Sequence, residues 1–168
     1  MEPRLSASDR LRSFVFGVED SLVSTVGLVS GIASVGLPKA TILLTGTILI
    51  FVEAFSMAVG SLLSENSAHE FRTRTEIPLR KSFISAGIMF FSYFLSGFVV
   101  IAPYLIFVSV ADAFLYSIII SLCALFVLGG ISARFSGLSV LKKGLTMTLV
   151  GGSAIAIGVI VGSVIQTL

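Results

Sequence analysis

Long apolar stretches, separated by short polar connections, dominate the hydrophobic pattern of this chain. A helix needs about 20 mostly apolar residues to cross a bilayer, and five of the stretches are long enough. We therefore predict five membrane-spanning helices. Their expected ranges are 14–36, 40–63, 83–107, 113–133 and 144–168, and a polar cytoplasmic loop is expected over 64–82.

The composition is typical of a membrane protein. Hydrophobic residues make up 55% of the 168 residues and charged residues only 12%, and the mean hydropathy is +1.07. A soluble body of this size would be unable to bury so much apolar surface. The formal net charge of +2 is too small to indicate a nucleic-acid partner. We expect one all-α, polytopic domain over 1–168 in a lipid bilayer, and no nucleic acid.

The basic residues predict the orientation of the helices. With five spans and a cytoplasmic N-terminus, the cytoplasmic segments hold ten basic residues and the opposite side holds only Lys39. An excess of Lys and Arg marks cytoplasmic loops, so we expect an N-in, C-out topology. Because no targeting segment is evident, we expect a prokaryotic cell membrane, with a vacuolar or other organelle membrane as the alternative. The ten residues are Arg4, Arg10, Arg12, Arg72, Arg74, Arg80, Lys81, Arg134, Lys142 and Lys143.

The first apolar stretch contains a carboxylate, Asp20, on a face of small and polar residues. A carboxylate inside a membrane helix is costly unless it faces a partner, water or an ion. Ser24, Gly27 and Gly31 follow Asp20 at helical spacing, and the GxxxG pair lets another helix approach closely. We therefore expect Asp20 to face a protein interface or a cavity. The alternative is a structural carboxylate that accepts hydrogen bonds from Ser24 or caps a broken helix.

The second stretch contains Glu53 and Met57, which are four residues apart and so lie on one side of a helix. A carboxylate beside a thioether suits a borderline transition metal such as ferrous iron, although Met also fills gaps in apolar cores. At about 1.5 Å per residue, Asp20 and Met57 lie about 9 Å from the cytoplasmic ends of their predicted helices, and Glu53 lies one turn deeper. These donors therefore share a thin slab. The alternative for Glu53 is an interhelical hydrogen bond of the protonated acid.

The polar segment after the second stretch contains a second pair, Glu65 and His69, also four residues apart. If the second helix extends into water, the two side chains lie together and offer a metal-capture site. The alternative for His69 is a solvated side chain, because an isolated histidine has no identifiable partner to orient it. The chain has no HExxH motif and no clustered nucleophile, base and oxyanion donor. We therefore expect no enzymatic activity.

Several motifs resemble the vacuolar iron transporter family. They are Phe16-Gly17-Val18-Glu19-Asp20-Ser21-Leu22-Val23-Ser24-Thr25, Val29-Ser30-Gly31-Ile32-Ala33, Ser56-Met57-Ala58-Val59-Gly60 with Leu63-Ser64, Ala102-Pro103-Tyr104, and Gly144-Leu145 through Val150-Gly151-Gly152. The resemblance implies a five-helix domain that dimerises, with a path for ferrous iron or manganese at the subunit interface. It also implies that proton exchange drives the metal out of the cytoplasm. Asp20 matches the family's helix-one aspartate, and Met57 matches its helix-two methionine.

The chain departs from the family pattern at two places. The family's helix-two glutamate usually lies two turns before the methionine, where this chain has Leu49, whereas Glu53 lies one turn before it. We expect Glu53 to replace that glutamate from the adjacent turn. Many members also insert a glutamate-rich cytoplasmic domain between helices two and three, and residues 64–82 are too few to form it. Capture by Glu65 and His69 is therefore expected to be weaker.

These observations together predict a homodimeric divalent-metal transporter. Asp20 and Met57, assisted by Glu53, would bind ferrous iron or manganese from both copies, with no tightly bound cofactor. Proton exchange would follow, because a carboxylate must lose its proton before it binds a metal. The alternative, from a different class, is a non-transporting membrane interaction or assembly protein that keeps the helical dimer.

Overall fold

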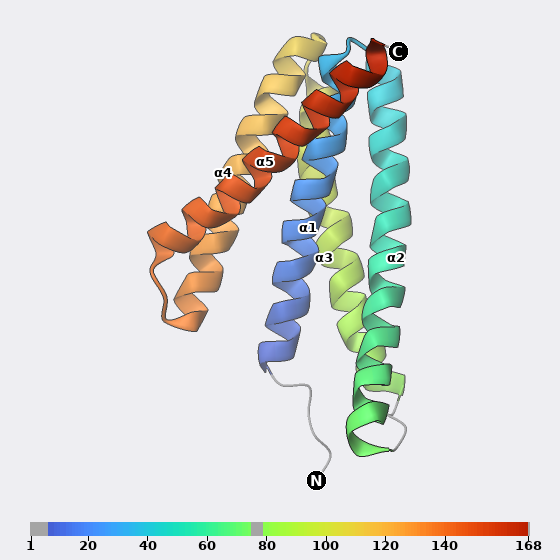
Figure 1. The fold of residues 1–168 in the computed structure, drawn as a ribbon, viewed down its shortest axis with the longest axis vertical. Helices are drawn as coiled ribbons and strands as arrows, with labels where there is room; N and C mark the ends of the chain where they lie inside the picture. Colours follow the sequence, from blue (N-terminus) through green and yellow to red (C-terminus); the bar gives the residue numbers. More distant parts are fainter. Residues whose placement is uncertain (1–6, 75–78, 168) are drawn as a thin grey trace.

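The computed structural model describes residues 7–74 and 79–167, and these residues form five long helices (Figure 1). Within this part of the chain, all five helices are long and apolar enough to cross a membrane. The predicted all-helical fold with five candidate spans is therefore confirmed. The helices are α1 (Ala7–Ser34), α2 (Lys39–Thr73), α3 (Leu79–Ile106), α4 (Val110–Ser136) and α5 (Val140–Gln166).

The largest difference from the predicted ranges is at the end of α2. The expected loop over 64–82 is wrong for its first ten residues, which continue the helix to Thr73, and for its last four, which begin α3. With 35 residues, α2 is about 52 Å long, whereas the hydrocarbon core of a bilayer is about 30 Å thick. The polar end of α2 therefore extends beyond the hydrocarbon layer into water. Its polar side chains are solvated there, and the chain remains helical. Arg74 ends the helix in a left-handed conformation, and residues 75–78 lie outside the described part.

α1 begins at Ala7, one to two turns before the predicted start. Ser13 is buried within this early part, and its hydroxyl oxygen lies 2.9 Å from that of Ser85 in α3. This contact holds the polar beginning of α1 against the bundle. The remaining part of the predicted lead-in, including Arg4, lies outside the described residues.

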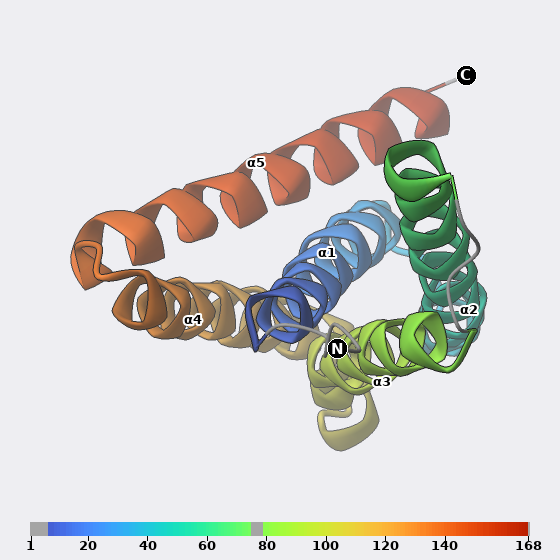
Figure 2. The ribbon, with the colours of Figure 1, turned by 90° about the horizontal axis from the view of Figure 1, so that it is seen from below.

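α1 is the central helix of the fold. Seen along the bundle, it lies among the other helices and contacts each of them, while α2 packs on α3 and α4 packs on α5 (Figure 2). One buried cluster joins Leu22 and Val26 of α1 to Leu125 of α4 and Met147 of α5. Because α1 is surrounded in this way, polar residues along it are placed inside the bundle.

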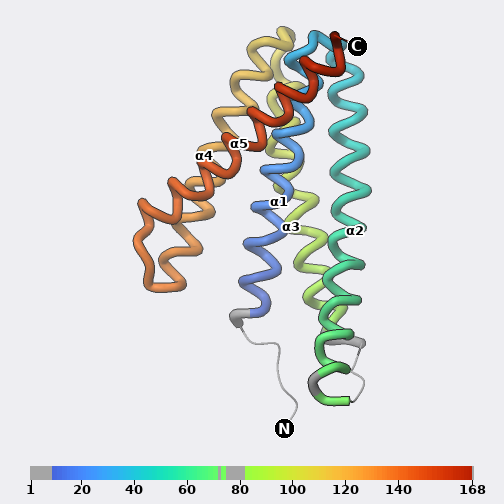
Figure 3. Tube along the Cα trace, viewed as in Figure 1, coloured from blue at the N-terminus to red at the C-terminus, as the bar shows by residue number. Residues whose placement is uncertain are grey.

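Glycines make the contact between α1 and α5. A Cβ atom on Gly31 would lie 2.6 Å from the carbonyl oxygen of Gly158, and one on Gly162 would lie 2.5 Å from the carbonyl oxygen of Gly31. The predicted close-packing face of α1 therefore has its partner within the same chain. Towards the turn that joins them, α4 and α5 together diverge from the other three helices (Figure 3).

Candidate functional site

Small polar residues line the contact between α1 and α3. The Ser21 hydroxyl donates a hydrogen bond to the main-chain oxygen of Tyr93 at 2.7 Å. One turn earlier, Gly17 leaves room for the side chains of Ser92 and Met89. Ser21, Ser92 and Tyr93 are all buried. These contacts fix the rotation of α1 about its axis, and so they fix the direction of Asp20, which precedes Ser21.

Two carboxylates and two hydroxyl groups meet near the middle of α1, α2 and α3. The Tyr93 hydroxyl lies 2.7 Å from the Ser24 hydroxyl and is fully buried. Asp20 and Glu53 lie close enough to Tyr93, and to each other, for their charges to interact. The fold therefore brings together acids that are 33 residues apart in the sequence, one from α1 and one from α2.

The side chains of Asp20 and Glu53 are half-buried. In the described part of the chain no hydrogen bond reaches either carboxylate, and the Ser24 hydroxyl pairs with Tyr93. The alternative for Asp20, a structural carboxylate that accepts a hydrogen bond from Ser24, is therefore not supported, because the described residues show no hydrogen bond between the two side chains. The carboxylate oxygens are free of hydrogen bonds from the described residues, which leaves them available to a cation.

Met57 lies one turn beyond Glu53 on α2 and is half-buried. The thioether therefore shares the side of α2 that carries Glu53. Met89 is buried and lies against Gly17, as expected for a core residue.

Glu65 lies far from the two central acids, in the last three turns of α2. Its carboxylate accepts a hydrogen bond from the Ser85 hydroxyl at 2.6 Å, and Ser85 in turn contacts Ser13. Twelve residues separate Glu65 from Glu53, which corresponds to about 18 Å along the helix. His69 follows on the same side of α2 and is half-buried. Glu65 thus joins α1, α2 and α3 at this end of the bundle, a role that the sequence did not indicate.

The described residues contain no group of three or more His, Cys, Asp or Glu side chains that could hold a metal ion. One chain therefore offers two carboxylates at the centre, with hydroxyl groups and a thioether nearby.

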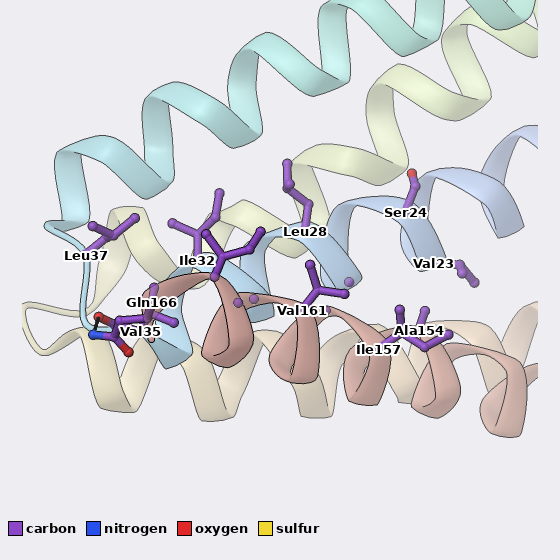
Figure 4. Close-up of a pocket in the computed structure, with 15 residues that line it drawn as sticks. Val23, Ser24, Leu28, Ile32, Val35, Leu37, Ala154, Ile157, Val161 and Gln166 are labelled. Carbon is purple, nitrogen blue, oxygen red and sulfur yellow. Dashed lines mark hydrogen bonds between the residues drawn. The ribbon is translucent and has the colours of Figure 1, made fainter. Parts of the chain in front are cut away.

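A groove with a volume of about 750 Å³ lies beside the α1–α5 contact (Figure 4). Its walls are almost entirely apolar and come from α1, α5 and the turn at Leu37. Ser24 lies at one end of the groove and also bonds to Tyr93. The groove therefore reaches the hydroxyl pair, but Asp20, which was expected to face an interface or a cavity, is not among the residues that line it. Residues of α1 on the wall include Val23, Ser24, Gly27, Leu28, Gly31 and Ile32.

Sequence reasoning missed Tyr93, because a tyrosine in an apolar stretch is typical of a core residue. A signal was nevertheless present in α3. The serines at positions 82, 85, 92 and 96 recur at spacings of three, seven and four residues, which places them on one side of a helix. All four are buried. Such a polar side within a membrane helix indicates a polar partner, here α1 and the end of α2.

The five candidate spans and the pair of acids at their centre define a polytopic helical membrane protein with acidic residues in its interior. A family model described as the VIT family matches residues 11–83 and 68–163. The chain belongs to the VIT family. Among curated proteins it is similar to vacuolar iron transporter 1 of Arabidopsis thaliana, with 22% identity over 224 residues that cover 98% of this chain and 90% of the relative.

Proposed function

We propose that this chain transports divalent metal, ferrous iron or manganese, out of the cytoplasm. The proposal depends most on one observation: Asp20 and Glu53 lie within electrostatic reach of each other and of Tyr93, whose hydroxyl group contacts Ser24, midway along three candidate membrane spans. Intramembrane acids are rare and mark ion pathways. The family match and the name of the plant relative, an iron transporter, support this choice of cargo.

The donor set fits a divalent transition metal. Carboxylate and other oxygen ligands suit Mn²⁺, and a thioether adds a softer donor for ferrous iron. Asp20 and Glu53 would supply the charge, and Tyr93 and Ser24 would orient neutral oxygens around the ion. Met57 would contribute from the next turn of α2. Glu53 would take the role of the family glutamate, whose usual position is occupied by Leu49 in this chain.

We further propose that the transporter is a homodimer. Two carboxylates cannot complete the coordination of a metal that prefers six ligands, whereas two copies would bring four carboxylates.

The plant relative also carries at least 56 residues that this chain lacks, since the match spans 224 residues and this chain has 168. The family model matches in two parts that overlap in residues 68–83, which favours the α2–α3 connection as the place of the missing segment. Capture before transport would then rest on Glu65 and His69 alone.

The placement of basic residues supports the N-in, C-out orientation. The beginning of α1, the end of α2 and the α4–α5 turn lie at one end of the bundle (Figure 1), and six basic residues whose side chains are described lie there. Lys39 lies at the opposite end, where its amino group donates to the Phe107 main-chain oxygen at 2.8 Å. This asymmetry matches the distribution that marks the cytoplasmic side. The six residues are Arg10, Arg12, Arg74, Arg134, Lys142 and Lys143.

Proton exchange follows from the chemistry of the acids. A carboxylate must be deprotonated to hold a metal ion, so protons and metal compete for the same oxygens. A proton arriving from the outer side would release the metal there, and loss of that proton towards the cytoplasm would prepare the site again. A proton gradient directed inward would therefore drive metal outward.

A flux assay tests the proposal. The full chain is reconstituted in vesicles, and Mn²⁺ or Fe²⁺ movement is followed for the wild type, Asp20→Asn and Asp112→Asn. Asp112 is an exposed acid in the first turn of α4, at the outer end in the proposed orientation, so its substitution is the matched control. We expect Asp20→Asn to abolish flux and Asp112→Asn to retain it. No carboxylate-dependent flux in the wild type would instead favour the membrane assembly protein.

A further inference from the structure

The turn between α4 and α5 carries a cluster of cations and large apolar side chains, which we call the α4–α5 tip. Residues 133–143 contain three basic residues and no acid. Three large apolar side chains around them are exposed, with Phe135 at 73%, Leu138 at 61% and Leu141 at 62%. In the described part of the chain no ion pair engages the cations. The cations are Arg134, Lys142 and Lys143.

The tip is a rigid structure. Gly137 adopts a left-handed conformation with φ 68°, and the N–H groups of Gly137 and Leu138 both bond to the Ala133 oxygen. The Ser139 hydroxyl then caps the beginning of α5. Behind the turn, a Cβ atom on Gly129 would lie 2.8 Å from the Lys143 main-chain oxygen, so α4 and α5 are in close contact. The main chain that carries the cations and the apolar side chains is therefore held in a defined conformation.

No other helix of the described chain covers the tip. Both views show α4 and α5 turning away from α1, α2 and α3 towards this end (Figures 1 and 2). Because the tip joins two candidate membrane spans, it lies at a membrane surface in either orientation of the chain. Apolar side chains there enter the acyl boundary, while long basic side chains reach the headgroups.

We propose that the α4–α5 tip binds the headgroups of anionic phospholipids. Cations with no acid in the same segment complement phosphate charge, and the apolar side chains between them anchor the tip in the same leaflet. The opposite end of the bundle gives the contrast. There, Val108 is 95% exposed in the α3–α4 turn, but its surroundings combine one acid, Asp112, with one cation, Lys39, whose amino group is bonded to Phe107. This proposal does not depend on metal transport.

A tryptophan reporter provides the test, because the chain has no tryptophan. Phe135→Trp places a single fluorophore in the tip, and Val108→Trp places one at the opposite turn. Each full-length variant is reconstituted in phosphatidylcholine vesicles that contain a minor fraction of phosphatidylglycerol. Bromine, which quenches tryptophan on contact, is carried at equal mole fraction either by the glycerol lipid or by the choline lipid. The ratio of the two quenching efficiencies measures local enrichment of the anionic lipid.

At Phe135→Trp we expect the anionic lipid to quench at least about twice as efficiently as the choline lipid. Each cation near an anionic surface strengthens the attraction to that surface by up to about fivefold. At Val108→Trp the ratio should be close to one. High salt should remove the preference, because 1 M salt shortens the screening length to about 3 Å. Equal ratios at the two reporters would overturn the proposal. Absence of quenching by either lipid would also overturn it, because the tip would then be covered by protein such as a second copy.

Charge variants separate the tip from the rest of the basic surface. In the Phe135→Trp background, replacing all three tip cations with glutamine should bring the ratio to one while the brominated choline lipid still quenches. A control removes the same charge from three exposed residues at the same end of the bundle, Arg10, Arg12 and Arg74, and should leave the ratio unchanged. If the tip variant keeps the ratio, or the control variant loses it, the tip is not the binding surface.

Discussion

The glycine contact between α1 and α5 makes a quantitative prediction for Gly162→Ala. The new Cβ atom would lie 2.5 Å from the Gly31 oxygen and 3.1 Å from its carbonyl carbon. Ordinary van der Waals contact begins at 3.4 Å, so α5 must move away from α1 by about 0.9 Å, from 2.5 to 3.4 Å. The atoms opposite are main chain and cannot rotate aside. Overpacking of this kind typically costs about 1–3 kcal/mol.

A helical alanine also gains about 1 kcal/mol over glycine, so we expect Gly162→Ala to lose about 0–2 kcal/mol of unfolding free energy in total. Gly152→Ala is the matched control on the same helix, because its Cβ atom would meet nothing within 4 Å. This variant should be as stable as the wild type or up to about 1 kcal/mol more stable.

The measurement is reversible unfolding of the purified full chain in mixed detergent micelles, with helicity followed by circular dichroism as the fraction of sodium dodecyl sulfate increases. The free energies of the two variants are compared under identical conditions. If Gly162→Ala is as stable as Gly152→Ala, α5 does not pack on α1 through these glycines, and the groove beside that contact would also be misplaced.

Three further predictions concern the polar contacts. Tyr93→Phe removes the 2.7 Å contact with Ser24 and should lower the unfolding free energy by about 1 kcal/mol. In a double-mutant cycle, Ser24→Ala should cause little further loss in the Tyr93→Phe background, whereas fully additive losses would argue against the hydrogen bond. Glu65→Ala removes the acceptor of the hydrogen bond from buried Ser85 and should lower the unfolding free energy by about 1–2 kcal/mol. The control, Glu70→Ala, changes an exposed side chain and should alter the unfolding free energy by no more than about 0.5 kcal/mol. Equal effects of the two variants in an unfolding assay would contradict the proposed bundle contact. Mn²⁺ affinity, measured by calorimetry, should fall as the pH is lowered, by up to about tenfold per pH unit for each proton displaced, and a pH-independent affinity would exclude competition at a carboxylate.

The sequence predicted the five spans because each is a long apolar stretch, and length and hydropathy are local properties of the chain. The helix ends were predicted less well. Ser13 pairs with Ser85 across 72 residues, and no local pattern contains that contact. The end of α2 is polar and looks like a loop, yet a helix continues there in water beyond the apolar layer. Both errors arose where tertiary contacts or solvent, and not hydrophobicity, decide the structure.

The site was predicted in part for a similar reason. The high cost of a carboxylate in lipid singles out Asp20 and Glu53 from the sequence, and the fold brings their charges together. Tyr93 was missed because its partner Ser24 is 69 residues away. Glu65 and His69 follow the predicted helical spacing, but Glu65 bonds to α3. Whether a side chain binds cargo or holds helices together depends on such distant partners.

The most direct test of the central claim is to locate Mn²⁺ in the full chain by anomalous diffraction. We predict a peak bounded by the carboxylates of Asp20 and Glu53, close to the Tyr93–Ser24 pair, and loss of that peak in Asp20→Asn. A peak found only beside Glu65 and His69, or one that persists at the centre of the bundle in Asp20→Asn, would contradict the account.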